Sequence, residues 1–479
     1  MLIFKKMTMK KINNLILVCG LIFLGFSCED ATDIFPEGNL TSDVTFETLE
    51  DLQLGLNGAY ARYSPEDDIL INSVFTDNCK PGYDNGGQEI NFYNWALTAG
   101  DGNTTSLWNS NYRLINQCNR VLEASDLITA SGEAEQTELN NIKGQLLTLR
   151  AIGHLTLASY FTTDYLDGDA LSIIISDRVP GTSETLPRNT NSEVYSFIAS
   201  DLNTASSLLS DQSDNKYVSQ DLVTGLKARL ALLQNDSSAL THAQTLIDAY
   251  PLASELQYLS MFLDTDNTEV IFKAARTSGL VGGLWYFTNS AGPFIEASNS
   301  LHDAHSPADI RLFANINFNT NNGGPSEPEN NIHLINKYPG NASPFLSDIK
   351  AMRVSEMYLI KAEAQVNANN LDGAAATLKV LRDARLGTST SLDSYISQTQ
   401  AYDAVLKERR LELAFEGHRY LDIKRFKDRL NTGINRDDLD CVSGGNCVML
   451  PSDHRLTLPI PQVELNANPS IVQNPGYAN

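Results

Sequence analysis

Apolar residues recur at three- to four-residue spacing in two long zones of this 479-residue chain. In the first zone the spacing begins with Phe46, Leu49, Leu52, Leu56, Ala59 and Tyr63, and it returns at 107–122, 139–161, 194–209 and 222–233. In the last zone a helix is expected at 354–366, and Asn370, a residue type that caps helices, opens a second stripe that runs to Arg385. Short polar connections separate these stripes. The sequence therefore predicts a mostly α fold, a tetratricopeptide-like scaffold of stacked helical hairpins with long ordered loops and a few short strands.

The middle of the chain, 264–350, has a different composition. It is rich in glycine and contains the Asn-rich run NINFNTNNGGPSEPENN at 315–331, with only short strand-like pieces such as 270–272. No long linker interrupts the chain, so we expect one domain, 43–479, with helical zones at about 43–263 and 351–430 around this loop-rich insertion. Long loops on a rigid scaffold are common places for binding surfaces.

The first 27 residues contain four lysines and no acid, and they include an apolar run at 15–24 that is too short to span a bilayer. This pattern predicts a signal peptide at 1–27. The run ends in LGFSC, which resembles the bacterial lipobox and makes Cys28 the expected site of lipidation, with simple cleavage as the alternative. Glu29 and Asp30 suit export to the outer face of the outer membrane, although an ordinary polar linker is also consistent. We therefore expect a lipidated tether at 28–42 and a protein anchored in the outer membrane, facing the exterior.

The chain carries 35 basic and 58 acidic residues, a net charge of −23. Removal of 1–27 takes away four lysines and no acid, which lowers the charge by four more. Such a body is repelled by nucleic acid and by anionic lipid, so no nucleic-acid partner is expected and the membrane contact is assigned to the lipid anchor. The charge also disfavours a polyanionic ligand, because a polyanion needs a local basic groove that the sequence does not reveal.

Four cysteines remain besides those at the N-terminus: Cys79, Cys118, Cys441 and Cys447. In an oxidising compartment the short Gly-rich loop from Cys441 to Cys447 is the easiest local closure, which leaves Cys79 and Cys118 for each other. Three connectivities are possible, and the sequence does not choose among them. No CxxC motif occurs, so redox catalysis and a Cys-based zinc site lose support.

A dense run of charge, ERRLELAFEGHRYLDIKRF, occupies 408–426. On a helix Glu408, Glu412 and Glu416 lie on one face and repel one another unless cations from other segments meet them. Three-residue spacing separates Arg409 from Glu412, Glu416 from Arg419, and Arg419 from Asp422. These residues can form a ladder of ion pairs if the helix continues past Gly417. A catalytic pair of carboxylates has to face each other across a cleft, which consecutive turns of one helix do not allow. The interleaved glutamates also oppose nucleic-acid binding. We therefore expect these six residues to form a structural ion-pair joint, partly buried and paired.

Three C-terminal segments resemble the SusD/RagB family of Bacteroidetes outer-membrane lipoproteins: RVSEMYLIKAEA at 353–364, ERRLELAFEGHRYLDIKR at 408–425, and LPIPQ at 458–462 with the terminal QNPGY. WNSNYRLINQCN at 108–119 adds weaker support. The resemblance implies a non-catalytic protein, without cofactor, that binds an oligosaccharide or polysaccharide at the cell surface. It further implies delivery to a SusC-type TonB-dependent transporter, with the protein acting as its lid. The alternative within the family is a RagB-like peptide receptor.

The residues that bind ligand have to be inferred from chemistry, since sugars require flat aromatic faces and side chains that hydrogen-bond to hydroxyls. Trp108 has helical spacing and is expected in the core. Trp95 closes a polar, Gly-rich segment, 81–94, and is expected to share one platform with Tyr83, Asn85 and Asn91, with loop packing as the alternative. The second candidate pair is Trp285 and Tyr286, for which a buried loop anchor is the alternative.

Other functional classes have less support. His302, His305 and Asp309 have a spacing compatible with a metal, but such pairs are more typical of polar surface, so no metal is predicted. The chain contains no GxSxG, HExxH, Walker A or GxGxxG motif. Two alternatives from other classes remain. One is a motif-free glycoside hydrolase with two carboxylates about 5–10 Å apart in a deep cleft, and the other is a purely structural surface protein.

Overall fold

The computed structural model describes residues 46–181, 183–277, 281–285, 293–317, 331–340, 345–441 and 445–478. Contacts along the chain divide it into Met1–Thr45 and Phe46–Asn479. The expected signal peptide, Cys28, the tether 28–42 and Tyr286 all lie outside the described residues. In the described part of the chain, no helix has the length and apolar character needed to cross a membrane.

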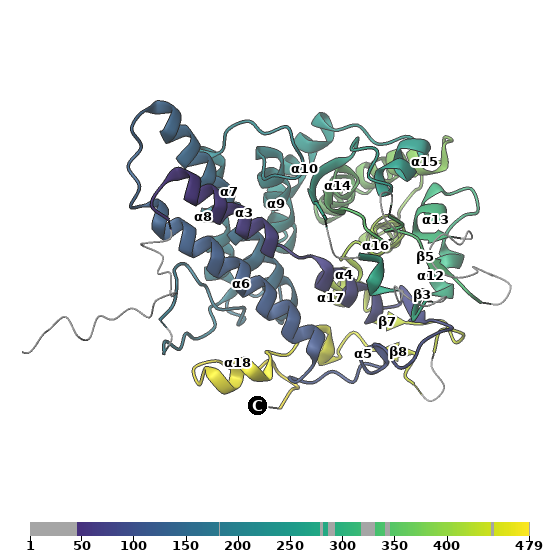
Figure 1. Ribbon diagram of the computed structural model, residues 1–479. Helices are drawn as coiled ribbons and strands as arrows, with labels where there is room; N and C mark the ends of the chain where they lie inside the picture. Colours follow the sequence, from purple (N-terminus) through teal and green to yellow (C-terminus); the bar gives the residue numbers. More distant parts are fainter. Residues whose placement is uncertain are drawn as a thin grey trace, which may run out of the picture. The chain divides into compact units, whose positions relative to one another are not determined.

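Helices dominate the described residues, as the apolar spacing predicts (Figure 1). The helices before the loop-rich insertion are α3 (Leu49–Arg62), α4 (Glu66–Val74), α5 (Ile90–Tyr93), α6 (Gly102–Ser125), α7 (Glu133–Phe161), α8 (Asn191–Leu208), α9 (Gln220–Leu233), α10 (Ser238–Ala249) and α11 (Glu255–Phe262). Those within and after it are η2 (Val281–Leu284), α12 (Asn299–Ala304), α13 (Ile310–Asn315), α14 (Val354–Asn367), α15 (Leu371–Leu386), α16 (Gln398–Glu412), α17 (Arg419–Leu430), η4 (His454–Leu456) and α18 (Gln462–Ala467). The mostly α fold class is confirmed.

Local sequence explains where several helices begin. At the start of α3 the Thr48 hydroxyl accepts a hydrogen bond from the Asp51 amide at 3.2 Å, and the Asp51 carboxylate accepts one from the Thr48 amide at 2.9 Å. This capping box satisfies two amides that the helix leaves without partners. Asn370 caps α15 by accepting from the Gly373 amide at 3.0 Å, as its position before the apolar stripe predicts.

Consecutive helices pack against each other: α6 on α7, α7 on α8, α9 on α10 and α14 on α15. The contact of α10 with α14 joins the first helical zone to the last across the insertion in the sequence, and Figure 1 shows these helices side by side. The apolar stripes face inward. Trp108 on α6 is 1% exposed and meets Phe161 edge-on, which confirms its predicted place in the core.

Short antiparallel strand pairs join distant parts of the chain. They are β1 (Cys79–Pro81) with β3 (Ile295–Ala297), β2 (Val270–Ala274) with β6 (Ile349–Arg353), β4 (Ile316–Asn317) with β5 (Leu334–Ile335), and β7 (Ile434–Asn435) with β8 (Val448–Met449). In the first pair Cys79 lies opposite Ala297, and Pro81 lies opposite Ile295. This register brings the loop after β1 beside the insertion. The sequence predicts a binding platform on that loop.

Candidate functional site

The charged segment at 408–426 is not one helix. Helix α16 ends at Glu412 and α17 begins at Arg419, with Phe415 (φ 63°) and Gly417 (φ 85°) in left-handed conformations between them. The ladder of pairs along a continuous helix is therefore wrong, because the helix stops before Gly417. Glycine adopts this conformation without steric cost, which explains the residue at the break.

Cations from other segments meet the three glutamates instead. Glu412 is completely buried and lies 2.9 Å from Arg353 and 2.9 Å from Arg385. Burial acts to raise the pKa of Glu412, but these two guanidinium groups outweigh it and hold the pKa well below its usual 4.5. The flanking pairs are Glu408 with Arg311 at 2.6 Å, Glu416 with Lys337 at 2.8 Å, Arg409 with Asp422 at 2.8 Å, and Arg419 with Asp77 at 2.7 Å. This network connects α16 and α17 to the insertion, β6 and α15, so it stabilises the packing of these segments.

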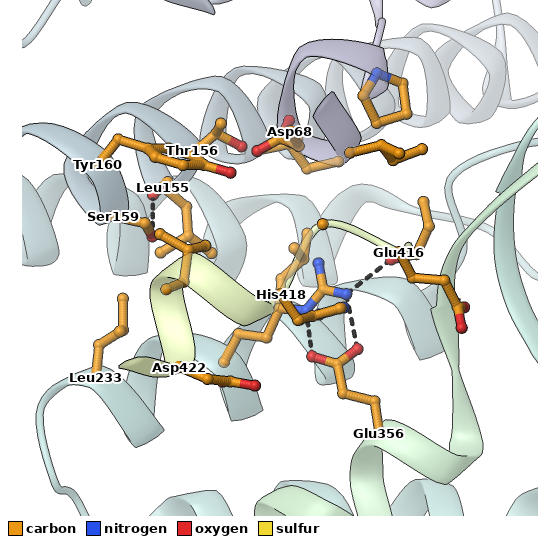
Figure 2. Close-up of a pocket in the computed structure, with 18 of the residues that line it drawn as sticks. Asp68, Leu155, Thr156, Ser159, Tyr160, Leu233, Glu356, Glu416, His418 and Asp422 are labelled. Carbon is orange, nitrogen blue, oxygen red and sulfur yellow. Dashed lines mark hydrogen bonds and ion pairs between the residues drawn. The ribbon is translucent and has the colours of Figure 1, made fainter. Parts of the chain in front are cut away.

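A partly open cavity lies beside this network, among α4, α7, α9, α14 and the start of α17 (Figure 2). It provides about 140 Å³ of space for water-sized molecules. Two of its charged groups are paired with each other, since Arg229 lies 2.7 Å from Glu356. Burial lowers the pKa of His418 to about 4. Burial also raises the pKa of Asp68 to about 7, against an opposing hydrogen bond from Tyr160. The cavity is thus a gap between packed helices whose lining is more apolar than polar.

The two tryptophans proposed as ligand contacts are both covered in this structure. Trp95 is 1% exposed, its indole N–H donates to the Phe75 carbonyl at 2.7 Å, and the guanidinium of Arg436 lies 4.2 Å from the centre of its ring. Trp285 is also 1% exposed and packs edge-on against Phe415. In this conformation neither ring presents a face to a ligand, so both serve as anchors beneath the loops, the alternative that the sequence left open.

The loop in front of Trp95 keeps the exposed members of the predicted platform. Tyr83 is 49% exposed, and Asn91 on α5 is also exposed. Asn85 instead uses its side chain to hold the loop, because its amide donates to the carbonyls of Phe294 at 2.6 Å and Gln88 at 2.9 Å. The structure therefore separates the predicted platform into an exposed part around Tyr83 and a more buried scaffold beneath it.

Tyr83 borders a surface hollow of about 370 Å³, which we call the Tyr83 hollow. Its lining residues are Lys80, Pro81, Tyr83, Glu296, Asn331, Ile332, Leu439, Asp440 and Cys441. The Glu296 carboxylate accepts a hydrogen bond from the Tyr83 amide at 2.7 Å, and Lys80 donates to the Asn331 side chain at 2.6 Å. Burial raises the pKa of Glu296, which its hydrogen bonds oppose. The hollow combines an exposed aromatic face with a fixed polar floor.

A second hollow with an exposed aromatic ring was not foreseen from the sequence. Tyr217, which is 40% exposed, lines it and meets Tyr60 edge-on with ring centres 5.4 Å apart. The loop containing Tyr217 shows no motif, so composition alone gave no signal for it. Among the described residues the exposed aromatic side chains are Tyr83, Tyr217 and Phe313, and of these only Tyr83 and Tyr217 line a described hollow.

Cys441 and Cys447 form a disulfide in the structure, the local closure favoured by the sequence. Cys79 and Cys118 are free thiols and do not form the second pair that this closure would leave. Burial raises the pKa of both. Since Cys441 lines the Tyr83 hollow, the disulfide closes the loop at its edge.

The histidines with metal-compatible spacing are engaged separately. His305 donates to the Leu301 carbonyl at 2.8 Å and accepts from Asn315 at 3.2 Å, while Asp309 binds Arg311 at 2.7 Å. His302 lies 2.8 Å from the neighbouring Asp303. Within the described ranges no group of three or more His, Cys, Asp or Glu side chains is arranged to hold a metal ion.

Stacked helical hairpins with short strand pairs between distant segments define a mostly α scaffold protein. Two family models match this chain: the SusD family over residues 314–477, and "starch-binding associating with outer membrane" over residues 33–232. The chain belongs to the SusD/RagB family.

Similar proteins span nearly its whole length. SusD-like protein P2 of Formosa agariphila is 24% identical over 527 residues, covering 98% of this chain and 100% of that protein. A SusD superfamily structure from Bacteroides thetaiotaomicron has a TM-score of 0.77 at 24% identity and covers 89% of this chain and 100% of its own. A putative sugar binding protein from Bacteroides vulgatus has a TM-score of 0.76 at 25% identity, with coverage of 91% and 100%.

Proposed function

We propose that this protein captures an oligosaccharide or polysaccharide at the cell surface and delivers it to a SusC-type TonB-dependent transporter, acting as its lid and not as an enzyme. The Tyr83 hollow is the observation that carries this proposal. A tyrosine residue that is 49% exposed beside polar groups is the combination that sugar rings require. Membership of the SusD/RagB family, with a model described as starch-binding, supports the same class of ligand.

The Tyr83 hollow is preorganised. The Gly82 amide donates to the Phe294 carbonyl at 2.9 Å, and the Asp84 amide donates to the Pro293 carbonyl at 3.2 Å. These bonds hold the backbone on both sides of Tyr83 before a ligand arrives. A surface that is already ordered loses less conformational entropy on binding, so a modest number of contacts suffices for useful affinity.

The lid mechanism requires an anchor and a moving body. We assign the anchor to Cys28 and its acyl chains, as the sequence predicts, and the moving body to Phe46–Asn479. The residues between them act as the tether in this proposal. Ligand would then be trapped between the body and the transporter when the lid closes.

Affinity electrophoresis of the chain from Glu29 onward, which contains the unit Phe46–Asn479, tests the sugar site. Native gels contain neutral or acidic polysaccharides, and calorimetry with mixed peptides runs in parallel. We expect one polysaccharide to retard the wild type and Tyr83→Ala to abolish most of that retardation. Phe313→Ala is the matched control, because Phe313 is also exposed, at 46%, but lines no described hollow.

The outcomes separate the alternatives. Loss of retardation in Tyr217→Ala but not in Tyr83→Ala would move the site to the second hollow. Heat evolved on adding peptides in the calorimeter, with no retardation by any glycan, would refute the glycan-binding hypothesis and favour a peptide receptor. Reducing ends released on incubation would identify a hydrolase.

Purification from the outer membrane tests the partner. A tagged chain should bring a TonB-dependent transporter with it, and Cys28→Ser should release the protein from the membrane fraction. A chain that copurifies with no transporter would contradict the lid.

A further inference from the structure

Two helices of the scaffold bring arginines together in a hollow of about 340 Å³ on the surface. Arg62 comes from the last turn of α3, and Arg113 and Arg120 come from α6. We call this site the arginine hollow and complete its lining with Asn109, Tyr112, Asn116 and Gln117. The three arginines are all exposed. It is the local basic groove that sequence inspection could not locate, because Arg62 is about 50 residues from the others in the chain.

The charge of the arginine hollow contrasts with that of the whole protein, which is −23. Helix α6 contains no acidic residue before Glu123, and Glu123 accepts a hydrogen bond from the Val179 amide at 2.7 Å. Among the described residues, neither Arg62 nor Arg113 makes an ion pair. The hollow therefore keeps positive charge that an anionic ligand can neutralise.

The floor of the hollow is fixed by hydrogen bonds. Tyr112 donates its hydroxyl to the Ile174 carbonyl at 3.0 Å, and Gln117 donates to the Gly55 carbonyl of α3 at 3.1 Å. Close approach of the helices makes the second bond possible, since a Cβ on Gly55 would lie 2.7 Å from Val121. On the rim, Arg120 donates to the Asn116 side chain at 2.9 Å. The spacing of the arginines is thus set by packed helices rather than by a loop.

The chemistry of these side chains narrows the ligand. Guanidinium groups form paired hydrogen bonds with planar carboxylates and bind sulfate and phosphate oxygens. Side-chain amides such as those of Asn109 and Asn116 hydrogen-bond to hydroxyl groups. The stripe from Asn109 to Arg120 is about 16 Å long at 1.5 Å per residue, which suits a segment of an extended polymer better than a single small anion.

We propose that the arginine hollow binds an acidic polysaccharide through sugar units that carry a carboxylate or a sulfate ester. This inference rests on the proposed function, since it names the class of glycan and adds a second contact surface on the scaffold. It also revises the preference for a neutral ligand that net charge alone suggests, because a local cluster can override the sign of the whole surface at distances within the Debye length of about 10 Å.

The test compares Arg62→Gln, Arg113→Gln and their double variant with wild type in gels containing polygalacturonate, κ-carrageenan or neutral amylopectin. Lys407→Gln is the matched control: it also removes one positive charge, but its side chain is 72% exposed on α16 and pairs with Asp403. We expect each single arginine variant to weaken binding of one acidic polymer about three- to tenfold and the double variant more, with unchanged melting temperature. Arg113→Lys should retain only part of the affinity, because lysine keeps the charge but loses the paired geometry.

Three results would overturn the inference. They are undiminished binding of the acidic polymers by the double variant, an equal loss in Lys407→Gln, and arginine-dependent binding to vesicles containing lipid A phosphates but to no acidic polysaccharide. Failure of the broader proposal looks different. If no polymer, neutral or acidic, retards the wild type, then glycan binding itself is refuted.

Discussion

Replacement of Glu412 by glutamine tests whether the buried ion-pair network holds the two helical zones to the insertion. Glu412 has a fully buried side chain, with Arg353 and Arg385 both 2.9 Å away and Arg311 at 3.5 Å. Glutamine keeps the shape of the side chain but removes the charge and turns one acceptor into a donor that faces guanidinium groups. The substitution therefore isolates the electrostatic contribution from packing.

The expected loss of stability follows from burial. Removing one partner from a buried charge pair costs about 3–5 kcal/mol, since the remaining charges stay out of water. Unfolding entropy of about 2.1 cal/mol/K per residue gives roughly 0.9 kcal/mol/K for the unit Phe46–Asn479. A loss of about 4 kcal/mol then lowers the melting temperature by roughly 4–5 °C.

The pH dependence has a definite sign. Because the folded pKa of Glu412 lies well below 4.5, its contribution is present above pH 4.5 and is lost as the pH falls toward the folded pKa. Melting curves at pH 7 measure the loss, with Glu138→Gln, an exposed position on α7, as the charge-matched control. Equal melting temperatures for the two variants would refute the reasoning. The double variant Glu412→Gln/Arg385→Met should lose less stability than the sum of the losses in the two single variants. In each single variant one buried charge loses its partner, whereas the double variant removes both.

Three further predictions follow from other sites. Asp68→Asn should gain roughly 2–3 kcal/mol of stability relative to wild type between pH 5 and pH 8, because burial raises the pKa of Asp68 to about 7, and the stability of its protonated form is lost as the pH rises through that value. Melting curves at the two pH values check this, and a constant difference would contradict it. Gly82→Ala should weaken glycan retention, because the new Cβ would lie 2.3 Å from the Pro293 carbonyl oxygen, whereas Gly86→Ala meets only the end of the Gln88 side chain and should bind normally. Replacing both Cys441 and Cys447 by serine should lower the free energy of unfolding by about 2 kcal/mol, from loop closure over six residues of separation, as urea titration can show.

The helical scaffold was predictable because its signal is local. Apolar spacing at 107–122 and 139–161 requires one buried face per helix, and the structure has α6 and α7 there. The cap at Asn370 and the core position of Trp108 follow from the same periodicity. These features depend on residues within a few turns of one another, so a single sequence carries them.

The candidate surfaces were less predictable because exposure depends on distant segments. Trp95 sits in a polar, Gly-rich loop, yet Arg436, more than 300 residues later, covers its ring. Tyr83, twelve residues before Trp95, remains 49% exposed although its backbone amide is hydrogen-bonded to Glu296. The sequence shows where the loop lies, but nothing local distinguishes which of its aromatic rings is covered.

The Tyr83 hollow and the arginine hollow share no lining residue, and this separation makes their combination informative. If both contact one acidic polysaccharide, Tyr83→Ala and the double arginine variant each remove contacts that the other leaves intact. Free-energy losses at independent sites add within about 0.5 kcal/mol, so the combined variant should show the product of the two fold-losses in affinity for polygalacturonate. Amylopectin, which has no carboxylate, should respond to Tyr83→Ala alone. A combined loss no greater than that of Tyr83→Ala would mean that the arginines do not touch the bound polymer, and calorimetry on the four proteins decides between these outcomes.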